Sequence, residues 1–144
     1  MTTAAGKAPS TKAGIDPAQV NLAKRVAKDI IDCDPAILSL IVIDDMGRVL
    51  HTGRSSRLPE SEQVSPVPVQ VFGTLAKVIM GAASNTAKIM GPTEAIVGIF
   101  KKQKVLLINL REYNLLLAIR LSRSANAEYV GDKISDLLAT SHEP

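Results

Sequence analysis

The sequence predicts an α+β domain with the element order α-β-β-α-β-β-β-α, in which five mainly antiparallel strands form one sheet with helices on both faces. Three segments repeat apolar residues every three or four positions, as amphipathic helices do. The β-rich segment 37–44 is almost continuously apolar, which is typical of a strand that is covered on both faces. Short links between the later strands favour antiparallel neighbours.

The chain begins and ends with segments that we expect to lie outside the domain. Residues 1–15 are small and polar and predict a disordered tail, residues 16–140 form the single domain, and residues 141–144 form a frayed tail. The first helix starts at Asp16, whose side chain can cap free backbone N–H groups, and Pro17 suits the first helical position.

The strands and the last helix follow from β-rich runs and from turn residues between them. Asp45-Met46-Gly47 is a turn that closes a hairpin between two strands. The expected ranges are strands 37–44 and 48–52, a polar loop 54–66, strands 94–100, 105–110 and 115–121, and a helix that begins after Ser124 or Asn126 and ends near residue 139.

The segment 67–91 predicts a long helix whose apolar arc is unusually wide. At about 100° per residue, this arc covers roughly 200°, whereas about 100° is enough to seat a helix on one core. The centre of the arc is formed by Phe72, Ala76, Ile79, Met80, Ala83, Ala87 and Met90, and Val71, Leu75, Val78, Ala82 and Ile89 extend it. We expect the surplus surface to meet another protein chain; the alternative is cover by the final helix or by the 54–66 loop of the same chain.

The chain has 144 residues, of which 46% are hydrophobic and 22% are charged, and this composition is typical of a globular protein. The apolar runs are too short for a membrane span, which needs about 20 residues, and no signal-peptide pattern starts the chain. The single cysteine, Cys33, cannot form an internal disulfide. These observations predict a cytoplasmic protein.

The sequence shows no constellation that would support catalysis. His51 and His142 have no partners at a suggestive spacing, and no phosphate-binding loop is present. Asp44 and Asp45 are consecutive at a strand end, so they favour a turn rather than a carboxylate pair. We therefore expect no enzyme activity, no cofactor and no metal.

A cluster of lysines lies between two of the predicted strands. Lys101, Lys102 and Lys104 belong either to a solvated turn or to a surface that steers an acidic partner. The net charge of +3 permits nucleic-acid binding, but aromatic residues are only 3% of the chain and are scattered, which argues against a base-stacking surface.

The order of elements over about residues 35–139 resembles the roadblock/dynein light chain domain. The resemblance rests on the hairpin 39–50, the Ala-rich helix segment 75–83, the strands from Glu94 and the last helix; longin and profilin-like folds share this layout. It implies a dimer in which central helices pack antiparallel and edge strands join into one sheet. The implied interface consists of Phe72, Gly73, Ala76, Ile79, Met80, Ala83, Ala87, Ile96, Val97, Gly98 and Ile99.

The same resemblance implies a function. Roadblock domains are non-catalytic scaffolds or regulators that bind Ras-like small GTPases, or adaptors on motor and signalling complexes. The implied partners are a second copy of this chain or a paralogous roadblock chain, and a Ras-like GTPase. Two alternatives remain open on the residues alone: a PAS-like small-molecule sensor, which needs a cavity between sheet and helix, and a basic nucleic-acid-binding protein.

Overall fold

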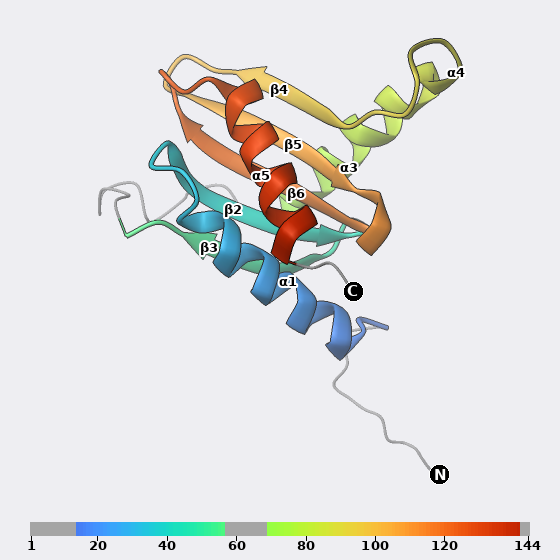
Figure 1. Ribbon diagram of the computed structural model, residues 1–144. Coiled ribbons are helices and arrows are strands. Elements are labelled where there is room, and N and C mark those ends of the chain that lie inside the picture. The colour runs from blue at the N-terminus through green and yellow to red at the C-terminus, as the bar shows by residue number, and fades with distance from the viewer. Residues whose placement is uncertain (1–13, 57–68, 142–144) are drawn as a thin grey trace.

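A computed structural model describes residues 14–56 and 69–141 and confirms the predicted α+β fold class. The strands form one antiparallel sheet in the order β3-β2-β6-β5-β4 (Figure 1). The elements are α1 (Pro17–Ile31), β2 (Ile37–Asp44), β3 (Val49–Arg54), α3 (Val69–Ala83), a 3-10 turn (Ser84–Thr86), α4 (Ala87–Met90), β4 (Ala95–Ile99), β5 (Gln103–Leu110), a second 3-10 turn (Arg111–Tyr113), β6 (Leu115–Ser122) and α5 (Ala127–Ser141).

Parts of the predicted tails and of the predicted polar loop fall outside the described residues. These are 1–13 of the N-terminal tail, 57–66 of the loop, and 142–144 at the C-terminus. Within the described residues, Ile15 packs against the core, and α5 continues through Ser141.

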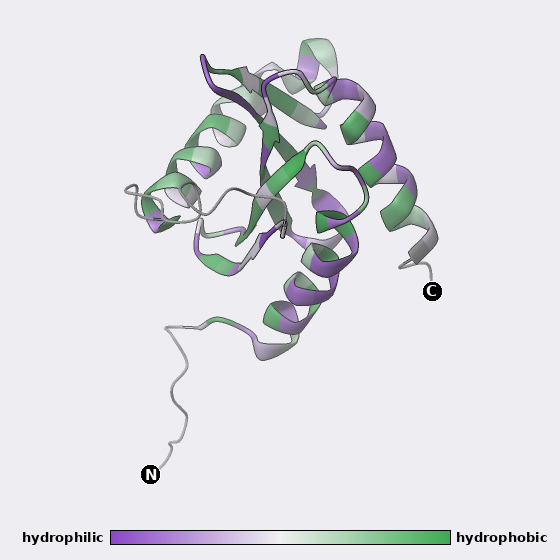
Figure 2. Cartoon of the chain, turned by 90° about the vertical axis from the view of Figure 1, so that its left-hand side faces the viewer, coloured by the Kyte–Doolittle hydropathy of each residue, from purple (hydrophilic) through white to green (hydrophobic). Residues whose placement is uncertain are grey.

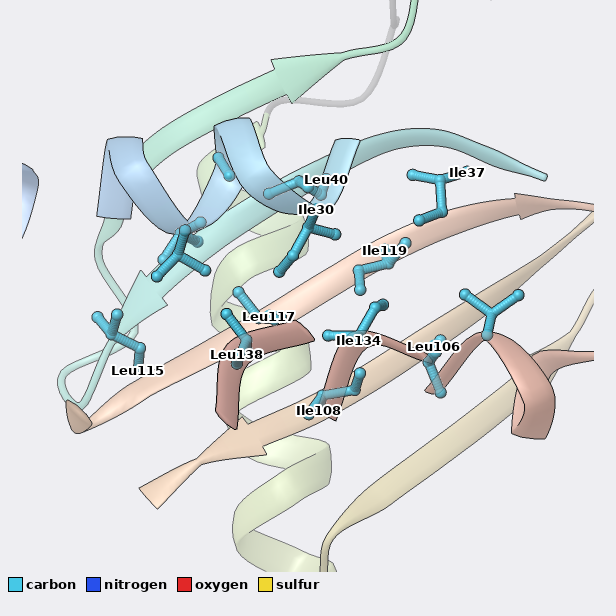
Figure 3. Packing of buried hydrophobic residues seen from close by; sticks show 14 of the residues in the cluster. Ile30, Ile37, Leu40, Leu106, Ile108, Leu115, Leu117, Ile119, Ile134 and Leu138 are labelled. Carbon is cyan, nitrogen blue, oxygen red and sulfur yellow. The ribbon is translucent and has the colours of Figure 1, made fainter. Parts of the chain in front are cut away.

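The sheet is buried on both faces because successive side chains of its central strands point to opposite sides. In β6, Leu115, Leu117, Ile119 and Leu121 pack beneath α1 and α5 (Figure 3), whereas Leu116 and Ala118 pack beneath α3. Two helices therefore cover one face, and α3 is the one helix of the described residues that packs on the other (Figure 1).

The first residues of α1 and α5 agree with the N-terminal capping residues predicted from the sequence. The Asp16 carboxylate accepts a hydrogen bond from the Ala18 N–H at 2.9 Å, and Pro17 is the first residue of α1. At α5, the Asn126 side chain accepts from the Tyr129 N–H at 3.0 Å, so Asn126 rather than Ser124 caps this helix.

The predicted single helix over 67–91 is wrong, because the helix is interrupted after Ala83. The Ser84 hydroxyl donates to the carbonyl oxygens of Met80 and Gly81, both at 3.0 Å, and Ser84–Thr86 form a 3-10 turn. Ser84, Asn85 and Thr86 are weak helix formers whose side chains compete for backbone hydrogen bonds. The apolar arc is thus divided between α3 and the short α4.

The turn between β2 and β3 is organised by one buried carboxylate. Asp44 accepts hydrogen bonds from the backbone N–H groups of Met46 and Arg48, both at 2.9 Å, and its second oxygen lies 2.8 Å from Arg48 Nε. The turn-forming role predicted for this acidic pair is therefore confirmed for Asp44. The neighbouring Asp45 is exposed.

Replacing Asp44 by alanine should lower the free energy of unfolding by about 2–3 kcal/mol, because two turn N–H groups and the guanidinium of Arg48 lose their acceptor. Urea denaturation of the purified protein measures this change. Asp45→Ala is the matched control and should change stability by less than about 0.5 kcal/mol. Equal effects of the two substitutions would contradict the assignment of the turn to Asp44.

Candidate self-association surface

The apolar arc of α3 is used in two different ways. Gly73, Ala76 and Met80 are buried against the chain's own sheet, and the half-buried Phe72 packs against the same cluster. The sequence analysis placed these four residues at a dimer interface, whereas the structure packs them between α3 and the sheet of the same chain.

A second apolar flank of α3 is exposed. It consists of Val71, Leu75, Val78 and Ile79, and the exposed fractions of Leu75 and Val78 are 52% and 60%. On a helical wheel these four side chains span about 100°, which is the width that seats a helix on one partner. Figure 2 shows the same asymmetry, since α3 is mostly hydrophobic in colour whereas α1 and α5 alternate.

The polar side of α3 is already occupied by the β2–β3 turn. The Gln70 side-chain amide donates to the carbonyl oxygen of Gly47 at 2.7 Å, and its oxygen accepts from the Val49 N–H at 3.2 Å. A Cβ placed on Gly47 would lie 3.6 Å from the Lys77 side chain. These contacts fix the rotation of α3, so the exposed flank faces away from this turn.

The helix packs closely on the sheet at its first turns. A Cβ on Gly73 would lie 3.0 Å from Val49 Cγ2, so only glycine permits this approach. The close contact leaves no space between helix and sheet at this point. That packing favours a filled core over the ligand cavity that a PAS-like sensor requires.

The edge strand β4 is the second part of the surface. Its residues Ala95–Ile99 include no charged side chain, and Val97 and Ile99 are 43% and 64% exposed. Natural edge strands usually carry charges that discourage pairing with another chain. The opposite edge strand, β3, follows this rule, because it ends in the exposed Thr52 and Arg54.

Among the described strands, β4 pairs with β5 alone, and its outer side forms an edge of the sheet. The N–H of Phe100 donates to the Gln103 carbonyl, and the Glu94 carbonyl accepts from the Asn109 N–H, so even-numbered residues bond to β5. In an antiparallel ladder the alternate residues then direct both backbone groups outward. Ala95, Val97 and Ile99 therefore present their N–H and C=O groups at the sheet edge.

Phe100 explains why β4 contains a glycine. A Cβ on Gly98 would lie 3.2 Å from the Phe100 ring, so the ring occupies the space of the missing side chain. Gly98 and the half-buried Ile96 share the α3 face of the sheet, and Phe100 itself is 57% exposed. Phe100 was not among the predicted interface residues; its place two positions after a strand glycine is the signal that points to it.

The short helix α4 carries the most exposed apolar side chains of this region. Ile89 and Met90 are 89% and 74% exposed, whereas Ala83 and Ala87 are half-buried. In Figure 1, α4 extends beyond the β4 edge of the sheet. Exposed apolar side chains thus lie both on the edge strand β4, at Val97 and Ile99, and on α4.

The three lysines near β4 have different environments. Lys104 Nζ donates to the Ala125 carbonyl at 2.6 Å and so ties β5 to the segment before α5. Lys101 and Lys102 are exposed at the tip of the β4–β5 turn. These two lysines are therefore more accessible to a partner than Lys104.

The groups that could perform chemistry are dispersed. His51 lies on β3, where partial burial and then Lys24 lower the pKa of its imidazole, and burial raises the pKa of the Cys33 thiol. Among residues 14–56 and 69–141, no three His, Cys, Asp or Glu side chains come together as metal ligands. The helices in the same residues include none that is long and apolar enough to cross a membrane.

The fold matches solved roadblock structures at low sequence identity, while no family model and no curated protein matches the sequence. A roadblock/LC7 domain from Streptomyces avermitilis has a TM-score of 0.62 at 13% identity, covering 81% of this chain and 91% of that one. The gliding protein MglB from Thermus thermophilus has a TM-score of 0.65 at 20% identity, covering 87% and 91%. A structure of MglB in a tetrameric arrangement matches with the same TM-score and identity, covering 87% and 90%. The chain therefore has the roadblock/LC7 fold that the order of its elements implied.

Proposed function

We propose that this chain is a non-catalytic scaffold that acts as a dimer and regulates a Ras-like small GTPase. The observations that carry the proposal are the exposed apolar flank of α3 and the uncharged edge strand β4, which pairs with β5 alone among the described strands. A second chain could cover both. The second chain is another copy of this protein or a paralogous roadblock chain.

The α3 face of the sheet supports a helix-to-helix contact. The exposed flank of α3 faces away from the β2–β3 turn, and the half-buried Ile96 and Val105 belong to the part of the sheet that packs beneath α3. An antiparallel α3 helix of a second copy would cover both the flank and this part of the sheet. Full burial of side chains such as Leu75 and Val78 is worth about 1.5–3 kcal/mol each, so such a contact has a substantial driving force.

The interface in this proposal differs from the one expected from the sequence. It keeps Ile79, Ile96, Val97, Gly98 and Ile99, and Ala83 and Ala87 remain at its margin. It leaves out Phe72, Gly73, Ala76 and Met80, because the chain's own sheet takes them. The residues added on α3 are Val71, Leu75 and Val78.

Replacing Val78 by glutamate should convert the dimer to a folded monomer. Glutamate forms helices at least as well as valine, so the domain should keep its fold, while the charge cannot be buried at the helix contact. Light scattering at tens of micromolar should give the 15.3 kDa monomer mass for the variant and about twice that mass for the wild type.

The matched control is Lys77→Glu, on the neighbouring position of the same helix but on the side near the β2–β3 turn. It should leave the dimer intact. A wild-type protein that is monomeric at these concentrations, or a Val78→Glu variant that stays dimeric, would overturn the proposed interface.

The regulatory part of the proposal rests on the roadblock fold and is tested separately. We expect the dimer to bind a Ras-like GTPase of the same organism at least about tenfold more tightly in one nucleotide state than in the other. Biolayer interferometry with GTPases loaded with GDP or with a non-hydrolysable GTP analogue measures this difference. Dimeric protein that binds no such GTPase in either state would overturn the regulatory role while leaving the dimer in place.

A further inference from the structure

We propose that one end of the sheet docks on an anionic lipid membrane through Lys101, Lys102 and Arg123. All three side chains are exposed, and they lie in the two connections that follow β4 and β6. This role goes beyond the proposed dimer, because the α3 contact of that dimer does not include these three residues.

The lysine turn, which consists of residues 100–103, presents two basic side chains at its tip. The N–H of Phe100 donates to the carbonyl oxygen of Gln103 at 2.9 Å and closes a two-residue turn between β4 and β5. Lys101 and Lys102 are the two central residues of this turn. Their ammonium groups can therefore meet a surface that approaches this end of the sheet.

Arg123 lies near the lysine turn because β5 and β6 are paired to their ends. Gln103 is the first paired residue of β5, and its partner Ser122 is the last residue of β6. Lys102 comes directly before this pair in the sequence, and Arg123 comes directly after it. Figure 1 shows the β4–β5 and β6–α5 connections together at one end of the sheet. The three basic side chains therefore belong to one area of the surface.

Two further basic side chains hold these connections together. Lys104 Nζ donates to the carbonyl oxygen of Ala125 at 2.6 Å, and Arg120 Nε donates to Gln103 Oε1 at 2.7 Å. These contacts tie the start of β5 to the end of β6 and to the segment before α5. Because the Ala125 carbonyl has no net charge, Lys104 also adds its positive charge to the electrostatic potential of this end.

The charges of the domain are separated along the strands. The described residues provide no ion-pair partner for the three exposed basic side chains. The exposed acids Asp45, Glu94 and Glu112 lie in the connections at the opposite end of the sheet. An anionic surface attracts the basic end and repels the acidic end, so this separation orients the domain as it approaches a membrane.

The residues of the basic end favour a lipid surface over other anionic partners. Each lysine or arginine near an anionic leaflet strengthens binding about fivefold without a fixed geometry, which suits two lysines at the tip of a turn. Phe100, next to Lys101, is 57% exposed, and such apolar side chains strengthen the binding of basic surfaces to the headgroup region. Nucleic-acid surfaces commonly stack bases on several aromatic side chains, whereas Phe100 is the one aromatic residue of these two connections.

Co-sedimentation of the full chain with lipid vesicles tests this role. The wild type should bind vesicles of phosphatidylcholine with about one-third phosphatidylglycerol at least about tenfold more tightly than vesicles of phosphatidylcholine alone. High salt should remove this preference, because it screens exposed charges. Equal binding to the two kinds of vesicle at low salt would overturn the proposal.

Neutralising the basic end should remove most of the binding to anionic vesicles. The triple variant Lys101→Gln/Lys102→Gln/Arg123→Gln should bind them at least about tenfold more weakly than the wild type, since each charge contributes about fivefold. An unchanged melting temperature shows that this variant keeps its fold. A folded triple variant that binds as tightly as the wild type would contradict the assignment.

The matched control makes the same charge change on α1, at the exposed positions Lys24→Gln/Arg25→Gln/Lys28→Gln. It should retain most of the binding to anionic vesicles, because these residues do not belong to the basic end of the sheet. Equal losses in the two triple variants would show attraction by net charge alone and would overturn the docking site.

Polyglutamate and single-stranded DNA distinguish a membrane from an acidic protein or a nucleic acid. At the same concentration of negative charge, the wild type should bind both polymers more weakly than the anionic vesicles. Tighter binding to either polymer than to the vesicles, with loss of that binding in the triple variant of the basic end, would assign this surface to the other class of partner and overturn membrane docking.

Discussion

The apolarity of the sheet on both faces is the constraint on which the rest of this structure depends. Because Leu116 and Leu117 of β6 point to opposite sides, the chain must cover both faces to fold. It has two helices for one face, α1 and α5. For the other face the described residues provide α3, which packs on the strands and leaves one flank uncovered. A second chain would complete this layer.

The position of that flank depends on a polar contact rather than on hydrophobicity. The side chain of Gln70 holds the β2–β3 turn through both its amide and its oxygen, and Asp44 holds the same turn from within. The turn thereby fixes the rotation of α3 about its axis. Since the turn lies on the polar side of α3, the flank that contains Val78 faces away from this turn.

The fold could be predicted from the sequence to a large extent, but which apolar residues of the central helix belong to the chain's own core could not. Strand 37–44 and the cap at Asp16 follow from local patterns and agree with the structure. The apolar arc of the central helix was also evident, but an arc of that width contains two faces. Only tertiary contacts, such as Gly73 against Val49, show that Ala76 and Met80 belong to the core. The Ser84 interruption likewise depends on side-chain hydrogen bonds.

The charges on an edge strand influence whether that edge pairs with one defined partner or aggregates with many chains. Unpaired β4 offers three outward residues without charge, whereas β3 at the other edge carries the exposed Arg54. An uncharged edge strand does not promote aggregation when a partner chain covers it. The charges that discourage wrong partners lie just outside β4, at Glu94 and in the lysine turn. In the proposed dimer, opposite charges at the two ends of one strand would favour an antiparallel second copy, whereas a parallel copy would bring like charges together.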